Sequence, residues 1–288
     1  MGVWERLSSA VQEGRLVAGV RRRFRESVLR EHFYRRALKL PHPPRRHTLP
    51  CISHQGSFSA LPESILLKNS LDRAVADIGG PPDFIRAIEG MAGQKYRTFI
   101  NTLVGSHPDA RYLEIGSWKG STAAAALYGN SVKALCIDNW SQFGGPRSAF
   151  LANMERVRSP AVDLRLVEDD FRRVDYTSIG RFNIFFFDGP HDELDLYNAV
   201  MLARPALDQS FVLIVDDWNW RQVRLGIFRG VRDAGYSIVS SIEILTTPTY
   251  SRTTSNISDW HNGYFIAAVD KGSGRAATGS PLSTAAEH

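Results

Sequence analysis

Carboxylates gather where several predicted strands end, in positions from which they could act together on a small molecule. Asp188 stands in the run Phe-Asp-Gly-Pro-His, and Asp216 and Asp217 stand together in Val-Asp-Asp-Trp. Each run begins with apolar residues typical of a buried strand. Because the carboxyl ends of parallel strands open into one crevice, we expect these three acids to lie close together.

A divalent cation is the simplest reason to gather three acids. Uncompensated, Asp188, Asp216 and Asp217 would repel one another and raise their pKa values. An all-oxygen donor set suits Mg²⁺ or a similar hard cation. The alternative is that one acid at each junction caps the following helix, since Asp is a favoured N-cap residue. Capping does not readily explain the doubled acid, so we predict a metal site at these three residues.

A histidine follows the first of these acids at the same predicted crevice. His191 lies three residues after Asp188. An imidazole titrates near neutral pH and could take the proton from an acceptor hydroxyl. The simpler interpretation is an exposed histidine in a turn. We predict that Asp188 and His191 are catalytic.

A glycine-containing turn follows the first strand of the predicted sheet, in Glu114-x-Gly116-x-x-x-Gly120. Glycine allows close approach of the backbone to a ligand, and the helix that follows offers free N–H groups. The dinucleotide motif G-x-G-x-x-G is not matched, because the middle glycine is absent and Trp118 stands where a pyrophosphate would lie. The next strand ends in Asp138, which suits ribose hydroxyls. A nucleoside without a pyrophosphate fits both features, and an ordinary strand-to-helix turn is the alternative.

These motifs resemble those of the class I S-adenosylmethionine-dependent methyltransferases over roughly residues 109–270. The resemblance implies that the glycine motif holds the methionine part of S-adenosylmethionine and that Asp138 bonds the ribose. It also implies that Asp169 and Asp170 lie beside the adenine. The cofactor-binding residues expected in this way are Glu114, Gly116, Ser117, Gly120, Ser121, Asp138, Asn139, Asp169 and Asp170.

The acidic pattern is similar to that of the metal-dependent sugar O-methyltransferases, the macrocin O-methyltransferase-like family. In that family an Asp after the fourth strand and an acidic pair after the fifth hold Mg²⁺ beside two vicinal hydroxyls. Some members use a histidine shortly after the first ligand as the base. Asp188, His191, Asp216 and Asp217 match these positions. The resemblance implies methylation of a hydroxyl on a sugar, a glycan or another small acceptor, without specifying which.

Strands and helices alternate regularly after residue 109. Five buried runs joined by helical crossovers predict a parallel sheet, and two final runs without a helix between them predict an antiparallel pair at one edge. We expect an α/β fold with a doubly wound, mostly parallel, Rossmann-like sheet of about seven strands, preceded by N-terminal helices. The expected strands are residues 112–115, 134–137, 164–167, 183–187, 211–215, 236–244 and 264–269. The expected helices are residues 121–128, 147–158, 193–204 and 221–234.

The chain divides into four predicted segments. Residues 1–50 form a basic arm, with an amphipathic helix over 17–40 and a proline-rich linker. Residues 51–108 form a helical cap region, and residues 109–270 form the methyltransferase domain. The tail, residues 271–288, is rich in Gly, Ser, Ala and Thr and is expected to be disordered.

Basic charge is concentrated in the arm. Its 50 residues hold twelve Lys or Arg and four Asp or Glu, a net charge of +8 against +5 for the whole chain. The helix either packs on the domain or on a second subunit, as in a homo-oligomer, or contacts an anionic membrane surface, a nucleic acid or a phosphorylated substrate. The expected partners are a small-molecule or glycan acceptor and, through the arm, a membrane surface or a phosphorylated substrate.

Two other functions remain open on sequence grounds: a nucleic-acid methyltransferase that uses the arm, and a non-catalytic scaffold of the same fold. The first lacks interleaved aromatic and basic residues, and Asp188-Gly-Pro-His replaces the D/N-P-P-Y run of base N-methylation. Intact cofactor positions disfavour the second. Cys51 and Cys136 offer neither a disulfide framework nor a CxxC site, and no signal peptide or membrane span is evident. A cytoplasmic protein is therefore expected, with peripheral membrane attachment as a further option.

Overall fold

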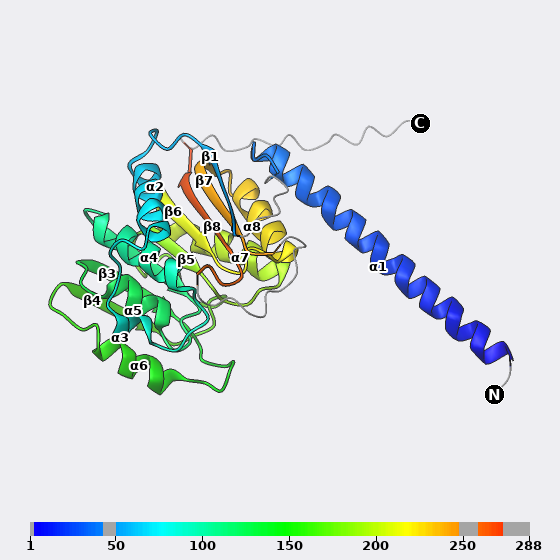
Figure 1. The fold of residues 1–288 in the computed structure, drawn as a ribbon, viewed down its shortest axis with the longest axis horizontal. Helices are drawn as coiled ribbons and strands as arrows, with labels where there is room; N and C mark the ends of the chain where they lie inside the picture. Colours follow the sequence, from blue (N-terminus) through cyan, green and yellow to red (C-terminus); the bar gives the residue numbers. More distant parts are fainter. Residues whose placement is uncertain (1–2, 43–49, 248–258, 273–288) are drawn as a thin grey trace, which may run out of the picture.

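The computed structural model describes residues 3–42, 50–247 and 259–272. Within these residues, eight strands form one sheet in the order β1-β7-β8-β6-β5-β2-β3-β4 (Figure 1). The strands are β1 (Cys51–Gly56), β2 (Ala110–Ile115), β3 (Val132–Ile137), β4 (Val162–Val167), β5 (Phe182–Phe187), β6 (Leu207–Val215), β7 (Ser237–Leu245) and β8 (Tyr264–Asp270).

The sheet has the predicted mixed topology with one more strand than expected. Strands β4, β3, β2, β5 and β6 are parallel, which confirms the Rossmann-like fold class. Strands β7 and β8 are the predicted antiparallel pair, but β8 lies inside the sheet, between β6 and β7. The edge beyond β7 is occupied by β1, which lies in the segment expected to be helical. Its sequence, Cys-Ile-Ser-His-Gln-Gly, holds too few apolar residues to resemble a buried strand.

Helices cover both faces of the sheet (Figure 1). Strand β5 shows why: Ile184 and Phe186 point into one hydrophobic core, and Phe185 and Phe187 point into the other, as expected when side chains alternate along a strand. The first core is covered by α2 (Pro62–Val75), α3 (Asp83–Arg86), α4 (Gln94–Ser106), α5 (Ser121–Leu127) and α6 (Arg147–Glu155). The second is covered by α7 (Glu193–Ala203), η1 (Arg204–Ala206) and α8 (Arg221–Asp233).

The basic arm contains one long helix, α1 (Val3–Ala37), which begins earlier than the predicted helix and ends three residues sooner. Its last turns pack on α8, and its first part extends away from the domain (Figure 1). The packed side buries two charged residues, Glu31 and Arg35, together with Tyr34, whereas Phe24 and Leu29 are exposed. Packing on the domain is therefore confirmed for the last turns, but the amphipathic pattern did not indicate which residues are buried.

Parts of two predicted segments lie outside the described residues. These are residues 43–49 of the linker and residues 273–288 of the tail. None of the helices described is both long enough and apolar enough to cross a bilayer.

Candidate active site

A cavity of about 600 Å³ opens at the carboxyl ends of the parallel strands. We call it the strand-end cavity. It is lined by residues that follow β2, β3, β4, β5 and β6 and by a short segment before β8. Those used below are Gly116, Trp118, Asp138, Asn139, Trp140, Asp169, Asp170, Phe171, Asp188, His191, Asp192, Asp216, Asp217, Trp220, His261 and Asn262.

The glycine turn after β2 has a backbone that only glycine adopts readily. Gly116 has φ +88°, and a Cβ at this position would lie 2.2 Å from the backbone oxygen of Asp188. Gly120, with φ +79°, stands immediately before α5. Glycine at 116 therefore lets the end of β2 lie directly against the end of β5. The turn serves the packing of the sheet as well as any ligand.

Asp138 closes the glycine turn through two of the three backbone hydrogen bonds that it accepts. Its Oδ2 accepts the N–H groups of Ser117 and Trp118, both at 2.8 Å. Its Oδ1 accepts the N–H of Trp140 at 2.7 Å. A carboxylate has about four lone-pair sites, so one site on Oδ1 remains for a ligand hydroxyl. The predicted ribose-binding acid is thus also the residue that fixes the turn.

Some of the predicted cofactor residues lie behind the cavity wall rather than on it. They are Glu114, Ser117, Gly120 and Ser121. Glu114 is fully buried and accepts a 2.5 Å hydrogen bond from the hydroxyl of Tyr112. Burial raises the pKa of Glu114 to about 7, and the nearby charge of Asp138 adds to the rise. Glu114 therefore lies inside the domain rather than in the cavity.

The acids after β4 line the cavity in company with arginines. Asp169 accepts a 2.9 Å hydrogen bond from Nε of Arg173 and one from the backbone N–H of Asp170. These hydrogen bonds lower the pKa of the Asp169 carboxyl. Asp170 accepts a 2.8 Å bond from Arg172. Phe171, directly after the two acids, also lines the cavity, where it offers an aromatic surface to a flat ring such as adenine. The sequence prediction missed Phe171 because nothing distinguishes it from a core residue.

The acids after β5 and β6 share the opposite end of the cavity. Asp188, Asp216 and Asp217 all line it, and the last two are buried. Burial raises the pKa of Asp188 well above its usual value, and the charge of Asp217 raises it further. Burial and the charge of Asp188 do the same to Asp216. This part of the site therefore lacks compensating positive charge, the condition that a bound cation would relieve.

Helix capping does not explain these acids. The N-cap of α7 is Asp192, and the N-cap of α8 is Trp220. Asp188 therefore stands four residues before the first cap, and Asp217 stands three residues before the second. The capping alternative is wrong for all three acids.

The three acids contact their neighbours instead of surrounding one point. Asp216 Oδ1 accepts the backbone N–H of Asp217 at 2.6 Å, and Asp217 Oδ1 accepts from Asn262 at 2.5 Å. Nε2 of His191 lies 3.1 Å from Asp217 Oδ2 and 3.5 Å from Asp188 Oδ1. In the described part of the chain, no three His, Cys, Asp or Glu side chains are arranged to hold a metal ion. The oxygen donors suit a hard cation, but the expected three-acid site is not preassembled.

Two polar residues before β8 complete this end of the cavity. His261 and Asn262 line it, and Asn262 bonds Asp217. Burial lowers the pKa of His261. The sequence offered no signal for either residue, because they come from the loop that enters the inserted antiparallel strand rather than from the end of a parallel strand.

Comparison with known families matches one part of the chain. Residues 113–218 match the family described as "Methyltransferase domain". The matched segment runs from β2 to the residue after Asp217, so it contains the glycine turn and all three cavity acids. The match makes residues 113–218 similar to a methyltransferase domain, and the sheet topology agrees with that fold. A comparison with curated proteins finds no significant match.

Several solved structures are similar at low identity. TrmN from Thermus thermophilus is 13% identical over 65% of this chain and 51% of its own, with a TM-score of 0.44. An O-methyltransferase from Bacillus cereus is 16% identical over 73% and 93%, with a TM-score of 0.44. The O-methyltransferase TomG from Streptomyces achromogenes is 14% identical over 71% and 89%, with a TM-score of 0.46. The chain thus spans about half of TrmN, and likenesses this distant carry no activity over to it.

Proposed function

We propose that this protein is an S-adenosylmethionine-dependent methyltransferase that transfers a methyl group to a hydroxyl oxygen of a sugar, a glycan or another small acceptor, with the help of a divalent cation. The observation that carries the proposal is the placement of His191 beside Asp188 and Asp217, in the same cavity as the glycine turn and Asp138. A candidate base, His191, and acids that lack compensating positive charge therefore line the same strand-end cavity as the predicted nucleoside site.

The cofactor would occupy the end of the cavity formed by the glycine turn and the β3 and β4 loops. Asp138 would accept a ribose hydroxyl, and Phe171 would lie against the adenine. The cavity is lined by more acids than bases, which favours the positively charged sulfonium of this cofactor. When bound, S-adenosylmethionine supplies the electrophilic methyl group.

His191 would act as the general base at the acceptor end. The two nearby carboxylates favour a proton on Nε2, which leaves the lone pair of Nδ1 to take the proton of the acceptor hydroxyl. Trp220 lies edge-on to His191, with ring centroids 5.2 Å apart, and supplies an aromatic wall against which a sugar face could pack. This combination of base and aromatic surface supports a hydroxylated acceptor.

The residues that would hold a divalent cation are Asp188, Asp216 and Asp217. A bound cation would lower the pKa of a coordinated hydroxyl and fix its direction. The raised pKa values of Asp188 and Asp216 support this assignment, because a positive charge would remove the cause of both shifts. Mg²⁺ is the expected ion, given donors that are all oxygen.

We also propose that the exposed apolar side of α1, which includes Val20, Phe24 and Leu29, lies on an anionic membrane surface. Val20, Phe24 and Leu29 are more than half exposed on a helix rich in arginine. Exposed apolar side chains between basic ones suit a headgroup layer, which offers both an apolar boundary and negative charge. A second copy of so basic a helix would instead repel it.

Isothermal titration of S-adenosylmethionine tests the central proposal, with Mg²⁺ present and then with EDTA. We expect binding in both conditions, and Asp138→Ala should weaken it by about tenfold or more, the equivalent of about 1.4 kcal/mol. Asp163→Ala, an exposed acid on β4, is the matched control and should bind normally. If the unaltered protein does not bind the cofactor in either condition, the non-catalytic scaffold becomes the better interpretation.

A further inference from the structure

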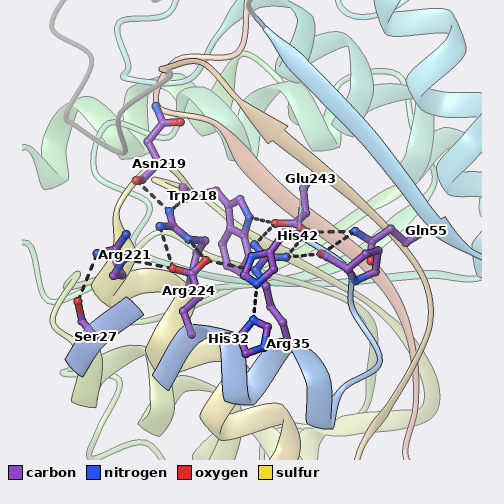
Figure 2. A network of polar contacts seen from close by, with 12 residues as sticks. Ser27, His32, Arg35, His42, Gln55, Trp218, Asn219, Arg221, Arg224 and Glu243 are labelled. Carbon is purple, nitrogen blue, oxygen red and sulfur yellow. Dashed lines mark hydrogen bonds and ion pairs between the residues drawn. The ribbon is translucent and has the colours of Figure 1, made fainter. Parts of the chain in front are cut away.

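A buried ion network joins α1 to the loop that carries Asp217 (Figure 2). At its centre is Arg224 of α8, whose side chain is fully buried. Its Nη1 donates to the backbone oxygens of Trp218 at 2.7 Å and Asn219 at 2.9 Å. Its Nε donates to Oε1 of Glu31 in α1 at 2.9 Å. One guanidinium therefore bridges the N-terminal arm and the two residues that follow Asp217.

Arg35 extends this network from α1 to β7. Its guanidinium donates to both carboxylate oxygens of Glu243, each at 2.7 Å, and its Nε donates to Glu31 at 3.2 Å. Glu243 in turn accepts the indole N–H of Trp218 at 2.8 Å. Trp218 is thus held at its carbonyl by Arg224 and at its side chain by Glu243.

The loop needs this support because its backbone is unusual. Asp217 has φ +54°, in the left-handed region that residues other than glycine seldom adopt. Such a conformation persists only where its surroundings enforce it. The backbone N–H groups of the same residues are also bonded. The N–H of Trp218 donates to the backbone oxygen of Gly263 at 3.2 Å, and the N–H of Asn219 donates to that of Asn262 at 3.0 Å. The carbonyls of the loop are therefore held by Arg224 and its amides by the segment before β8.

We propose that Arg224 and Glu31 are positioning residues for Asp217. Arg224 fixes the two peptide groups after Asp217. The Asp217 carboxylate therefore faces His191 and the acceptor end of the cavity. Glu31 neutralises and orients Arg224, which makes the last turns of α1 a part of the site. The structural claim stands by itself, and its effect on cation binding rests on the function proposed above.

Arginine is needed here for its shape as well as its charge. A lysine at 224 keeps the positive charge but has a single ammonium group, which cannot hold both carbonyls and Glu31 in the same fixed geometry. Arg224→Lys is therefore the informative variant, and Glu31→Gln removes the partner charge without changing the size of the side chain. Arg111→Lys is the matched control. Arg111 also pairs with a carboxylate, Asp208 at 2.6 Å, but the pair is only partly buried and lies at the end of β2 away from the cavity.

Hydrogen–deuterium exchange of the full-length protein is the primary test. In Arg224→Lys and in Glu31→Gln, the peptide that covers residues 216–220 should exchange about tenfold faster, which corresponds to the loss of roughly one buried hydrogen bond. The peptide that covers the glycine turn should not change, and neither peptide should change in Arg111→Lys. Equal acceleration of the 216–220 peptide in Arg111→Lys would overturn the proposal, because it would indicate general destabilisation.

Ligand binding gives the second readout. We expect Arg224→Lys to weaken Mn²⁺ binding by about tenfold, the equivalent of about 1.4 kcal/mol, while S-adenosylmethionine binds as in the unaltered protein. Normal Mn²⁺ binding in Arg224→Lys would overturn the positioning role. If the unaltered protein binds neither ligand, the proposed function fails, whereas the exchange result still decides whether Arg224 holds the loop. Should Glu31→Gln fail to fold, Arg224→Lys decides alone.

Discussion

Nε2 of His191 lies 3.1 Å from Oδ2 of Asp217. The imidazole thus occupies a place beside two of the acids proposed to bind a cation. A cation held by Asp188 and Asp217 would supply the positive charge that these carboxylates lack, with the imidazole of His191 beside it.

We expect a divalent cation to bind only when the acids of this cluster are intact. Asp217→Asn removes one charge from the cluster and should weaken Mn²⁺ binding by at least about tenfold, or about 1.4 kcal/mol. Isothermal titration of Mn²⁺ measures this change. Asp192→Asn is the control, because Asp192 lines the same cavity but is exposed. Equal binding by both variants would contradict a metal site at Asp217.

Gly116→Ala should destabilise the protein strongly. The new Cβ would combine a left-handed backbone with a 2.2 Å approach to the oxygen of Asp188. We expect a loss of about 3 kcal/mol in the free energy of unfolding, measured by urea denaturation. Gly129→Ala separates the two causes, since Gly129 also has positive φ, +73°, but open space around its Cβ position. That control should lose only about 1 kcal/mol, and a similar loss for both variants would mean that the close approach is unimportant.

The charge of Glu31 should make the free energy of unfolding decrease as the pH falls into the acid range. Burial pushes the pKa of its carboxyl upward, but the attraction of Arg224, Arg35 and Arg221 prevails and holds the pKa at about 2, below the usual 4.5. A pKa that is lower in the folded protein stabilises the fold above pH 4.5, and the contribution disappears as the pH falls from 4.5 to about 2. The shift corresponds to about 3 kcal/mol.

Urea unfolding between pH 7 and pH 3 measures this contribution. Glu31→Gln should be less stable than the unaltered protein at pH 7, and the difference between them should shrink as the pH falls. A difference that stays constant over this range would show that the charge of Glu31 does not stabilise the network.

The exposed apolar side of α1 should bind anionic vesicles. Co-sedimentation with phosphatidylserine-containing vesicles should retain the full-length protein and lose it at high salt, because the attraction is partly electrostatic. Replacing Phe24 and Leu29 by Gln should reduce the retention and leave cofactor binding unchanged, since both side chains are exposed. Retention of this variant at the same level, or equal retention by neutral vesicles, would count against the membrane proposal.

The sequence predicts the parallel part of the fold well because most strands there are buried apolar runs, the exception being the edge strand β4. Phe182–Phe187 is apolar at five of six positions, and its neighbours are similar. Strand β1 escaped prediction because an edge strand needs few apolar residues, and α1 was misjudged because charged residues, Glu31 and Arg35, share its buried face with Tyr34. The pairing of Glu31 with Arg224 joins residues 193 positions apart, and no local pattern encodes it.

The candidate site also contains some residues that the sequence predicts and others that it does not. Residues directly after parallel strands, such as Asp138 and Asp188, were predicted because the topology alone brings strand ends together. Asn262 was missed, since its position depends on how β8 enters the sheet. The arrangement of the acids was also beyond the sequence, because it depends on the turned backbone of Asp217 and on the bonds of its neighbours.

Strand β1 has a practical consequence for anyone shortening this chain. It pairs with β7 from Cys51 opposite Leu245 to Gly56 opposite Ser240. A version that starts after Gly56 would leave backbone groups of β7 unpaired along its buried stretch from Ser240 to Leu245, which is a template for association with other chains. Such a version should precipitate or form fibrils even if the rest of the sheet folds, so the short polar strand protects the whole domain from aggregation.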